Sequence, residues 1–492
     1  MTGVLTHREY ALVAELSRVL DEAGYTEKEV KAAIGVTGEL LISTAHLSRY
    51  RHSLVTDGPL RDIVRLFVLA EPLPRSLAAA AFAPVDLRSL EELGLLECER
   101  DRVRPLVHVV PFRHVRLVHD FDAAELQQDH VSGVSRSSAL LETLTVRKRV
   151  ELTLDVGSGC GVQALLAAQH SARVIATDLN PRAVRFTELS ARLSGIDNVD
   201  VRQGDGFEPA RESSFDLILS NLPYVLSPDR SYLFRDSGAP GDAMSQSAVL
   251  SAAALLREGG IAEIMSNWID AEKDWSARPR RWLEGAGCDA WLLHAHSEDA
   301  LTYAASFLRP LDVRDPKYPA ALDRWVDYYR KAGIEKIASG VVILRRRAAS
   351  NWTRADEMPL PSAAASEHIL RVFAAEDDLR TLDQDSDLLD SAFRLVEPHR
   401  LEQTLYFRDA HYETPPARLV LQNGVGVVGE VPSSHLVVLF HLDGTRALRQ
   451  VVSDVAGQIG VDTDKAVFDI LRIVRRLYQL GIVVRTSPQA QP

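Results

Sequence analysis

The middle of the sequence predicts an α/β fold, in which helices cover both faces of a parallel sheet. Short apolar runs rich in Val, Ile and Leu alternate there with segments whose apolar residues recur at helical spacing. Such alternation is typical of strand–helix–strand units, which form parallel sheets. Four runs begin the predicted sheet: ELTLDV (151–156), ARVIATD (172–178), VDVRQGD (199–205) and FDLILSN (215–221).

The remaining elements of this region follow the same alternation. Pro181 fits the first position of a helix because the missing N–H has no partner there in any case. The last two strands are expected on either side of an aromatic-rich insert, residues 296–337, whose rings we expect to form a core. The predicted helices are 162–170, 181–195 and 248–259, and the further predicted strands are 261–267, 290–296 and 338–347, which gives a seven-stranded sheet.

Regions of different character flank this sheet. Residues 1–128 are expected to form a mainly helical domain that ends in a pair of strands, either a winged-helix-like module or a plain helical cap. Residues 129–348 are expected to form the α/β domain. A linker with Pro and Ala then opens residues 349–492, which are expected to form an α+β domain.

The composition indicates in which compartment the protein works and which partners its charge does not favour. A formal net charge of -12 gives no overall field that would attract nucleic acid. Cys98, Cys160 and Cys288 are far apart and odd in number, which favours a reducing compartment over a disulfide framework. The first residues carry charges inside their apolar pattern, unlike a signal peptide, and no run approaches the ~18 apolar residues of a membrane span. We therefore expect a cytoplasmic protein without a membrane span.

A glycine-rich turn follows the first predicted strand. In LDVGSGCG (154–161), Gly157, Gly159 and Gly161 lie between a strand and a helix, with Asp155 ahead of them. Glycine permits a left-handed backbone and lets a ligand approach closely. The G-x-G-x-G spacing differs from the dinucleotide fingerprint and resembles that of class I S-adenosylmethionine-dependent methyltransferases. The resemblance implies a Rossmann-like sheet and a loop that packs against the methionine part of S-adenosylmethionine; a tight turn without a ligand is the alternative.

Two acids at the ends of the next strands fit the same cofactor. Asp178 ends the second strand, where its carboxylate can accept hydrogen bonds from both ribose hydroxyls. Asp205 ends the third strand, and the resemblance implies that it accepts a hydrogen bond from the adenine amino group. Gly206 and Phe207 follow it, and Phe207 is expected to cover the adenine ring. For Asp178 the alternative role is that of a helix N-cap.

The fourth strand ends in SNLPY (220–224), which resembles the Asn-Pro-Pro-Tyr motif of amino-methylating members of this family. An amide or aromatic amine is a poor nucleophile because its nitrogen lone pair is delocalised. The side-chain carbonyl of Asn221 and the backbone carbonyl of Leu222 can accept both N–H bonds and direct the lone pair at the methyl group. Pro223 fixes the turn, and Tyr224 offers a face for a planar substrate. We call these four residues the clamp, and expect Asn221 to border the cofactor as well; an ordinary strand-end turn is the alternative.

The surroundings of the clamp favour one branch of the family. Asn-Leu-Pro-Tyr itself resembles the motif of rRNA adenine dimethyltransferases, yet residues 131–141 and 234–260 resemble segments of the glutamine methyltransferases of release factors and ribosomal proteins. The resemblance covers residues 129–268 and implies an N-methyltransferase whose macromolecular acceptor is a protein glutamine or asparagine. The alternatives are a nucleobase exocyclic amine in RNA or DNA, a small natural-product amine, and a cofactor-binding protein with vestigial catalysis.

A metal site is not expected. His294 and His296 share one face of a predicted strand, with Glu298 and Asp299 close behind them. Partly exposed histidines on a strand are nevertheless more common than a metal-binding pair.

Overall fold

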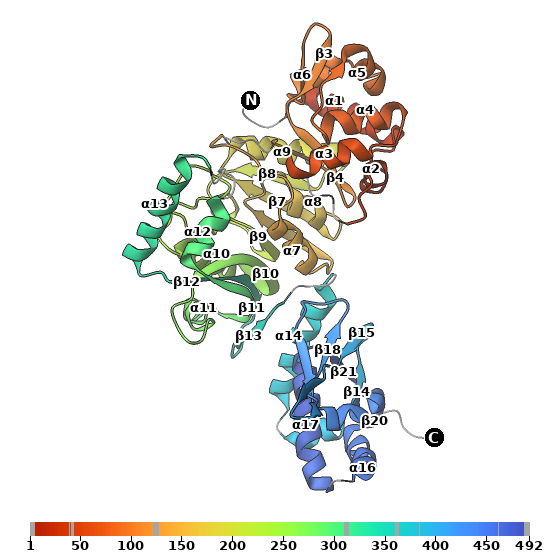
Figure 1. Ribbon diagram of the computed structural model, residues 1–492, viewed down its shortest axis with the longest axis vertical. Coiled ribbons are helices and arrows are strands. Elements are labelled where there is room, and N and C mark those ends of the chain that lie inside the picture. The colour runs from red at the N-terminus through yellow and green to blue at the C-terminus, as the bar shows by residue number, and fades with distance from the viewer. Residues whose placement is uncertain are drawn as a thin grey trace. The chain divides into compact units, whose positions relative to one another are not determined.

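The computed structural model describes residues 5–38, 40, 44–121, 127–308, 314–359, 364–382, 384–460 and 462–486 (Figure 1). These residues belong to two compact units. The first unit comprises residues 1–142 and 147–355, and the second comprises residues 143–146 and 356–492. Parts of the predicted insert (309–313) and of the predicted linker (360–363) lie outside the described residues. The domain boundaries expected near residues 128 and 348 stay predictions.

An eight-stranded sheet forms the centre of the first unit, in the order β13-β11-β12-β10-β9-β6-β7-β8 (Figure 1). The five strands from β10 to β8 in this order pair in parallel, as the alternation predicted, whereas β12 is antiparallel to both of its neighbours. The strands are β6 (Val150–Val156), β7 (Ser171–Asp178), β8 (Val199–Gln203), β9 (Phe215–Ser220), β10 (Leu256–Ile269), β11 (Cys288–Asp299), β12 (Lys336–Arg346) and β13 (Thr353–Glu357).

The sheet has one strand more than the seven that the sequence predicted. The additional strand, β13, lies beside β11 at the edge of the sheet. The chain is held there because the backbone N–H of Ala290 donates to the carbonyl of Trp352 at 2.8 Å. The side chain of Asp289 accepts from the N–H of Trp352 at 3.2 Å. Unpaired backbone groups at a sheet edge favour such an addition.

The helices of this α/β region begin and end where capping residues permit. Asn180 accepts a hydrogen bond from the Arg182 N–H at 2.9 Å and places Pro181 at the first position of α9, as predicted. The helices are α7 (Arg136–Leu144), α8 (Val162–Ala167), α9 (Pro181–Leu193), α10 (Ala243–Leu255), α11 (Ala277–Trp282), α12 (Ala300–Leu308) and α13 (Lys317–Ala332), with a 3-10 turn η1 (Glu208–Ala210) after β8.

The aromatic residues of the predicted insert mostly form a core, as expected. Tyr303 on α12 and Trp325 and Tyr329 on α13 are buried together with Leu226, which follows the clamp. The hydroxyl of Tyr329 donates to the carbonyl of Leu226 at 2.7 Å, and the N–H of Leu226 donates to the Tyr303 hydroxyl at 3.2 Å. The insert therefore fixes the chain just beyond the clamp.

The N-terminal region of the first unit is mainly helical and ends in small antiparallel sheets. Its helices are α1 (His7–Glu22), α2 (Glu27–Ala33), α3 (Thr44–Ser53), α4 (Gly58–Phe67), α5 (Arg75–Phe82) and α6 (Leu87–Glu92). Its strands are β1 (Leu73–Pro74), β2 (Leu96–Cys98) and β3 (Arg102–Pro105), paired in the order β1-β3-β2, and the separate hairpin β4 (His108–Phe112) and β5 (Val115–His119).

One hydrophobic cluster joins this region to the helices beside the large sheet. Leu16 and Leu20 of α1 belong to the same buried cluster as Leu165 of α8 and Phe186 and Leu189 of α9. Polar contacts cross the same boundary, since the Arg185 side chain of α9 donates to Glu9 of α1 at 2.7 Å. The N-terminal region and the sheet region thus share a core.

The second unit is α+β, as predicted. Asp378 on its first long helix accepts hydrogen bonds from Arg485 at 2.8 Å and from the Tyr478 hydroxyl at 2.8 Å, which fixes that helix to the last helix and strand. The helices are α14 (Ser366–Thr381), α15 (Asp385–Leu389), α16 (Leu448–Ile459) and α17 (Thr463–Gln479), with a 3-10 segment η2 (Ser433–His441). The strands are β14 (Ala392–Leu395), β15 (His399–Glu402), β16 (Tyr406–Arg408), β17 (His411–Glu413), β18 (Ala417–Leu421), β19 (Val428–Val431), β20 (Asp443–Ala447) and β21 (Val483–Thr486).

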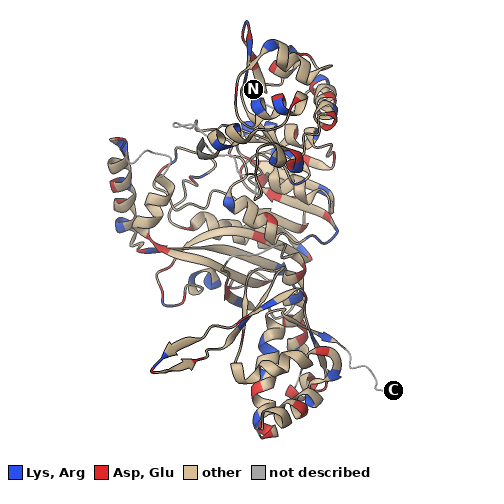
Figure 2. Ribbon diagram, turned by 45° about the vertical axis from the view of Figure 1, so that its right-hand side comes forward, with Lys and Arg blue, Asp and Glu red and all other residues tan. Residues whose placement is uncertain are grey.

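Charged residues of both signs are distributed along the described chain. Figure 2 shows Lys and Arg interspersed with Asp and Glu on both units, rather than gathered on one basic face in this view. Within the described ranges, no helix combines the length and the apolar character that crossing a membrane requires. A cytoplasmic location stays a prediction.

Candidate active site

The predicted site residues converge on one pocket of about 590 Å³ in the first unit. The pocket lies where β6, β7, β8 and β9 end, the edge at which open α/β sheets bind ligands. Gly161 and Phe207 do not line it. The predicted residues that do are Asp155, Gly157, Gly159, Asp178, Asp205, Gly206, Asn221, Leu222, Pro223 and Tyr224.

The glycine-rich loop adopts the left-handed conformation that its sequence predicted. Gly157, Gly159 and Gly161 have φ angles of 74°, 57° and 87°. The N–H of Gly157 donates to the carbonyl of Thr177 at 2.9 Å, which ties the loop to β7. A Cβ at Gly161 would lie 2.5 Å from the side chain of Leu165, so that glycine allows α8 to pack closely although it does not reach the pocket.

Asp155 is a buried carboxylate at the base of the loop. Its side chain accepts a hydrogen bond from the backbone N–H of Ala164 at 2.9 Å and so fixes the first turn of α8. Burial, followed by the negative charge of Asp178, raises the pKa of Asp155 to about 7. A positive charge placed beside it would favour its ionised form.

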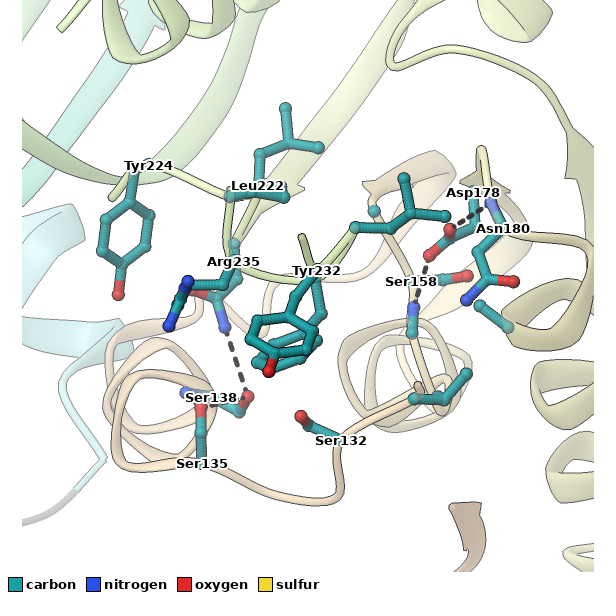
Figure 3. Close-up of a pocket in the computed structure, with 18 of the residues that line it drawn as sticks. Ser132, Ser135, Ser138, Ser158, Asp178, Asn180, Leu222, Tyr224, Tyr232 and Arg235 are labelled. Atoms are coloured by element: carbon teal, nitrogen blue, oxygen red, sulfur yellow. Dashed lines mark hydrogen bonds between the residues drawn. The ribbon is translucent and has the colours of Figure 1, made fainter. Parts of the chain in front are cut away.

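Asp178 closes the loop from the second strand. Its two carboxylate oxygens accept hydrogen bonds from the N–H of Gly159 at 2.8 Å and of Asn180 at 2.9 Å (Figure 3). The N-cap of α9 is Asn180, so Asp178 does not fill the capping role that was its alternative. Burial raises the pKa of Asp178. Each oxygen keeps a second lone pair with which it can bind a ligand hydroxyl.

The third strand end places Asp205 and Gly206 at the pocket and turns Phe207 away. The Thr177 hydroxyl donates to the carbonyl of Gly206 at 2.8 Å, which joins this turn to β7. Phe207 is half-buried and packs against the hydrophobic core of the sheet. Its predicted role as a cover for the adenine ring stays a prediction.

The clamp forms the other half of the pocket. The side-chain NH₂ group of Asn221 donates to the hydroxyls of Ser137 and Ser138, each at 3.2 Å. The Oδ1 atom of Asn221 is buried and has no hydrogen-bond partner among the residues that the structure describes. Tyr224 is the last residue of the clamp, and burial raises the pKa of its phenol.

Further residues line the half of the pocket that contains the clamp, and the sequence pattern did not assign them to a site. The guanidinium of Arg235 lies over the rings of Tyr232 and Trp325, at 4.9 Å and 5.5 Å from their centroids, and donates to Asp236 at 2.7 Å. Figure 3 shows Arg235 near Tyr224, with Asp178 and Asn180 at the other end of the view. Phe234 and Phe307 add two more aromatic side chains. The sequence had pointed to this region only through residues 131–141 and the segment that begins at Phe234, because both resemble segments of the glutamine methyltransferases.

The two histidines that the sequence offered as a metal pair lie elsewhere in the sheet. A bulge between His294 and His296 interrupts the regular alternation of β11. His294 contacts the Ser297 hydroxyl at 2.8 Å and stacks on Trp275, and His296 lies 3.6 Å from Glu298.

Two family models and several curated proteins match parts of this chain. Residues 134–269 match the family called Methyltransferase small domain, and residues 22–106 match a domain of unknown function, DUF7059. The release factor glutamine methyltransferase of Deinococcus radiodurans is 34% identical over 194 residues, which are 35% of this chain and 69% of that protein. The chain therefore belongs to the class I S-adenosylmethionine-dependent methyltransferases, in the group of the release factor and ribosomal protein glutamine methyltransferases.

Other relatives match a smaller part of their own length. The release factor glutamine methyltransferase of Aliivibrio fischeri is 31% identical over 181 residues, 35% of this chain and 61% of that protein. The ribosomal protein uL3 glutamine methyltransferase of Bradyrhizobium diazoefficiens is 35% identical over 161 residues, 30% of this chain and 50% of that protein. This chain thus spans between half and two thirds of these two curated relatives.

Proposed function

We propose that this protein transfers a methyl group from S-adenosylmethionine to the side-chain amide of a glutamine or asparagine in another protein. The observation that carries the proposal is the unpartnered Oδ1 atom of Asn221, buried beside the pocket at the end of β9. A buried acceptor without a partner is costly, so a ligand N–H is the natural group to satisfy it. The names of the relatives support a protein amide as the source of that N–H.

The residues on the β6, β7 and β8 side fit S-adenosylmethionine. Asp178 would bind the ribose hydroxyls, Asp205 the adenine amino group, and the loop with Gly157 and Gly159 the methionine part. The carboxylates on this side suit a ligand that carries a positive sulfonium and a positive ammonium group. These positive charges would favour the ionised form of Asp155. When bound, the cofactor supplies an electrophilic methyl group on positively charged sulfur.

The clamp would supply positioning rather than a strong base. The Asn221 side-chain oxygen and the Leu222 backbone carbonyl would accept the two N–H bonds of the acceptor amide and turn its nitrogen lone pair toward the methyl carbon. With its lone pair so directed, the acceptor nitrogen would take up the methyl group and would release one amide proton to water. Tyr224 would pack against the planar amide.

The acceptor class follows from the charge and the lining of this half of the pocket. Arg235 is paired with Asp236, so its charge is already neutralised. The other residues that line this half of the pocket are mainly aromatic, aliphatic or serine residues, together with His130. Such a lining suits an uncharged amide. The rings of Tyr232, Phe234 and Phe307 could also stack a nucleobase, so the exocyclic amine of a nucleobase is the second candidate.

One experiment separates these two acceptor classes. Purified protein is incubated with tritiated S-adenosylmethionine and a cell lysate that has been treated with ribonuclease or with protease. We expect label that survives ribonuclease, is lost after protease, and is absent with the Asn221→Ala variant. Label lost after ribonuclease would establish the nucleobase candidate instead, and the absence of enzyme-dependent label would contradict methyl transfer to either macromolecule.

A further inference from the structure

The clamp asparagine is held by a turn that lies more than eighty residues earlier in the chain. Ser137 and Ser138 lie in the first turn of α7, and their hydroxyls accept the two hydrogen bonds from the Asn221 NH₂ group at 3.2 Å. Two donors thus meet two acceptors, so the NH₂ group is fully occupied and faces the serines. The Oδ1 atom on the opposite side of the same planar group then faces away from the turn, and no described residue contributes a hydrogen bond to it.

A third serine holds the two hydroxyls in place. The Ser135 hydroxyl lies 2.8 Å from that of Ser137 and 2.9 Å from that of Ser138, and it also accepts the backbone N–H of Ser138 at 3.1 Å. Ser135 therefore caps the start of α7 while it contacts both other hydroxyls. Figure 3 shows Ser135 and Ser138 together, with a dashed hydrogen bond reaching Ser138 from the clamp side.

The same turn is tied to the cofactor side of the pocket. The side-chain NH₂ group of Gln163, on α8, donates to the backbone carbonyl of Ser138 at 2.7 Å. Gln163 is buried and is the second residue of α8, the helix that follows the glycine-rich loop. Asp155 fixes this first turn of α8 through Ala164. The serine turn is thus braced against the element that begins at the cofactor loop.

We infer that Ser135, Ser137 and Ser138 are positioning residues that set the orientation of the Asn221 amide, so that its oxygen is presented to the N–H of the acceptor. This inference rests on the proposed function. Without the hydroxyls, the amide would lose both hydrogen bonds and could rotate by half a turn about its last bond. That rotation would place NH₂ where the acceptor N–H has to bind, and two donors would then face each other.

A double-mutant cycle tests the inference in the full-length protein. The Ser138→Ala variant is prepared with and without Asn221→Ala, and Ser251→Ala on α10 serves as a control of the same chemistry away from the pocket. Ser137 is left unchanged in this test because its side chain also hydrogen-bonds the Tyr224 phenol. Turnover is measured with tritiated S-adenosylmethionine and the protein fraction of ribonuclease-treated lysate. We expect about a tenfold loss of kcat from the serine change, as the loss of one hydrogen bond would give. We expect no further loss where Asn221 is already alanine.

Two further readouts separate positioning from folding. The cofactor Kd from calorimetry should stay within about twofold, because the serines act through Asn221, and Ser138→Thr should restore kcat by restoring a hydroxyl. The nitrogen-15 spectrum of the Asn221 side-chain amide, recorded with cofactor and without acceptor, should shift in the serine variant. A serine variant with unchanged kcat, or an equal loss in both Asn221 backgrounds, overturns the inference.

The nitrogen-15 spectrum of the Asn221 side-chain amide tests the positioning role even if the proposed function fails. If the wild-type protein transfers no methyl group to the protein fraction, the proposed function fails, and the amide resonance still reports whether the serines hold Asn221. An Asn221 amide resonance that is unchanged by the serine substitution overturns the positioning role in either case.

Discussion

At the scale of single residues, the carboxylate of Asp178 combines a structural role with the proposed binding role. Its oxygens hold the N–H groups of Gly159 and Asn180 and, in the proposed function, would also bind the ribose hydroxyls. Asp178→Ala should weaken cofactor binding by about 1 kcal/mol or more, since hydrogen bonds to a charged group are lost. Calorimetry with S-adenosylmethionine measures this. Unchanged affinity in a variant with a native circular dichroism spectrum would remove Asp178 from the cofactor site.

The raised pKa of Asp155 predicts a dependence of stability on pH. The folded protein keeps this proton up to about pH 7, whereas the unfolded chain loses it near pH 4. The folded state therefore binds more protons between these values, and the free energy of unfolding falls as pH rises through this window. Asp155→Asn keeps the shape and cannot titrate.

Urea unfolding of both proteins near pH 5 and near pH 8 provides the measurement. The loss of stability between the two pH values should be smaller in the Asp155→Asn variant than in the wild type, because the contribution of this carboxyl is gone. An equal loss in both proteins would show that Asp155 is already ionised at the lower pH.

At the residue scale, local sequence patterns predict the site residues that lie at strand ends. The glycines, Asp155, Asp178 and the clamp were identifiable because each directly follows a strand, and parallel strands bring such positions to one edge. His130, Tyr232 and Phe307 reach the same pocket from three separate segments. Nothing in their local pattern distinguishes them from surface or core residues, since only tertiary packing assembles them.

At the scale of elements, the boundary between α10 and β10 differs from the prediction. The spacing predicted a helix up to Gly259, but α10 ends at Leu255 and β10 begins at Leu256. Gly259 has a φ of 75°, and the pairing with β9 is irregular between Leu256 and Ile261. Gly260 lies so close to β9 that a Cβ there would be 2.7 Å from the Phe215 carbonyl oxygen. A bulge cannot be recognised from hydrophobic spacing alone.

Asp229 follows the clamp and lies between the insert helix α13 and the part of the pocket lined by Tyr232, Phe234 and Arg235, which we call the wall. Its carboxylate accepts hydrogen bonds from Arg324 at 2.9 Å and from the Trp325 ring N–H at 2.8 Å, both on α13. These partners hold the pKa of Asp229 below its usual value although burial acts against them. Arg235 lies 3.9 Å away. Asp229 thus connects α13 to the wall that contains Tyr232.

Asp229→Asn should raise the KM for the protein acceptor while leaving the cofactor Kd within about twofold, because the wall loosens and the cofactor side does not. Asp327→Asn is the matched control, since Asp327 is an exposed acid on α13 that pairs with Arg330 at 2.6 Å. Steady-state kinetics with the labelled protein fraction compares the two variants. An equal KM in both would exclude Asp229 from acceptor binding.

At the scale of the whole molecule, the shared core makes different predictions for two truncations. A fragment of residues 1–355 keeps the N-terminal region and the sheet together, so it should fold and bind S-adenosylmethionine with the affinity of the full chain. A fragment of residues 129–355 would expose the apolar face of α9 that α1 covers, and it should aggregate or unfold at a lower temperature.

Thermal unfolding and calorimetry of both fragments check this prediction. A stable, cofactor-binding fragment of residues 129–355 would show that the N-terminal region is not needed to complete the core, and would leave acceptor recognition as its role. The sequence alone predicted a helical flank, but the shared core depends on which helix faces meet, and hydrophobic spacing does not specify the partner of a face.

The most direct measurement of the central claim is the turnover of wild type, Asn221→Ala and Asn221→Asp at saturating cofactor, with the methylated atom located by tandem mass spectrometry. We expect a methyl group on a side-chain amide nitrogen and a loss of about tenfold or more in kcat for the alanine variant. We also expect an intermediate rate for Asn221→Asp, which keeps the acceptor oxygens, and a cofactor Kd that changes little with alanine. Equal turnover of wild type and Asn221→Ala, or a methyl group on another kind of atom, would contradict the proposed function.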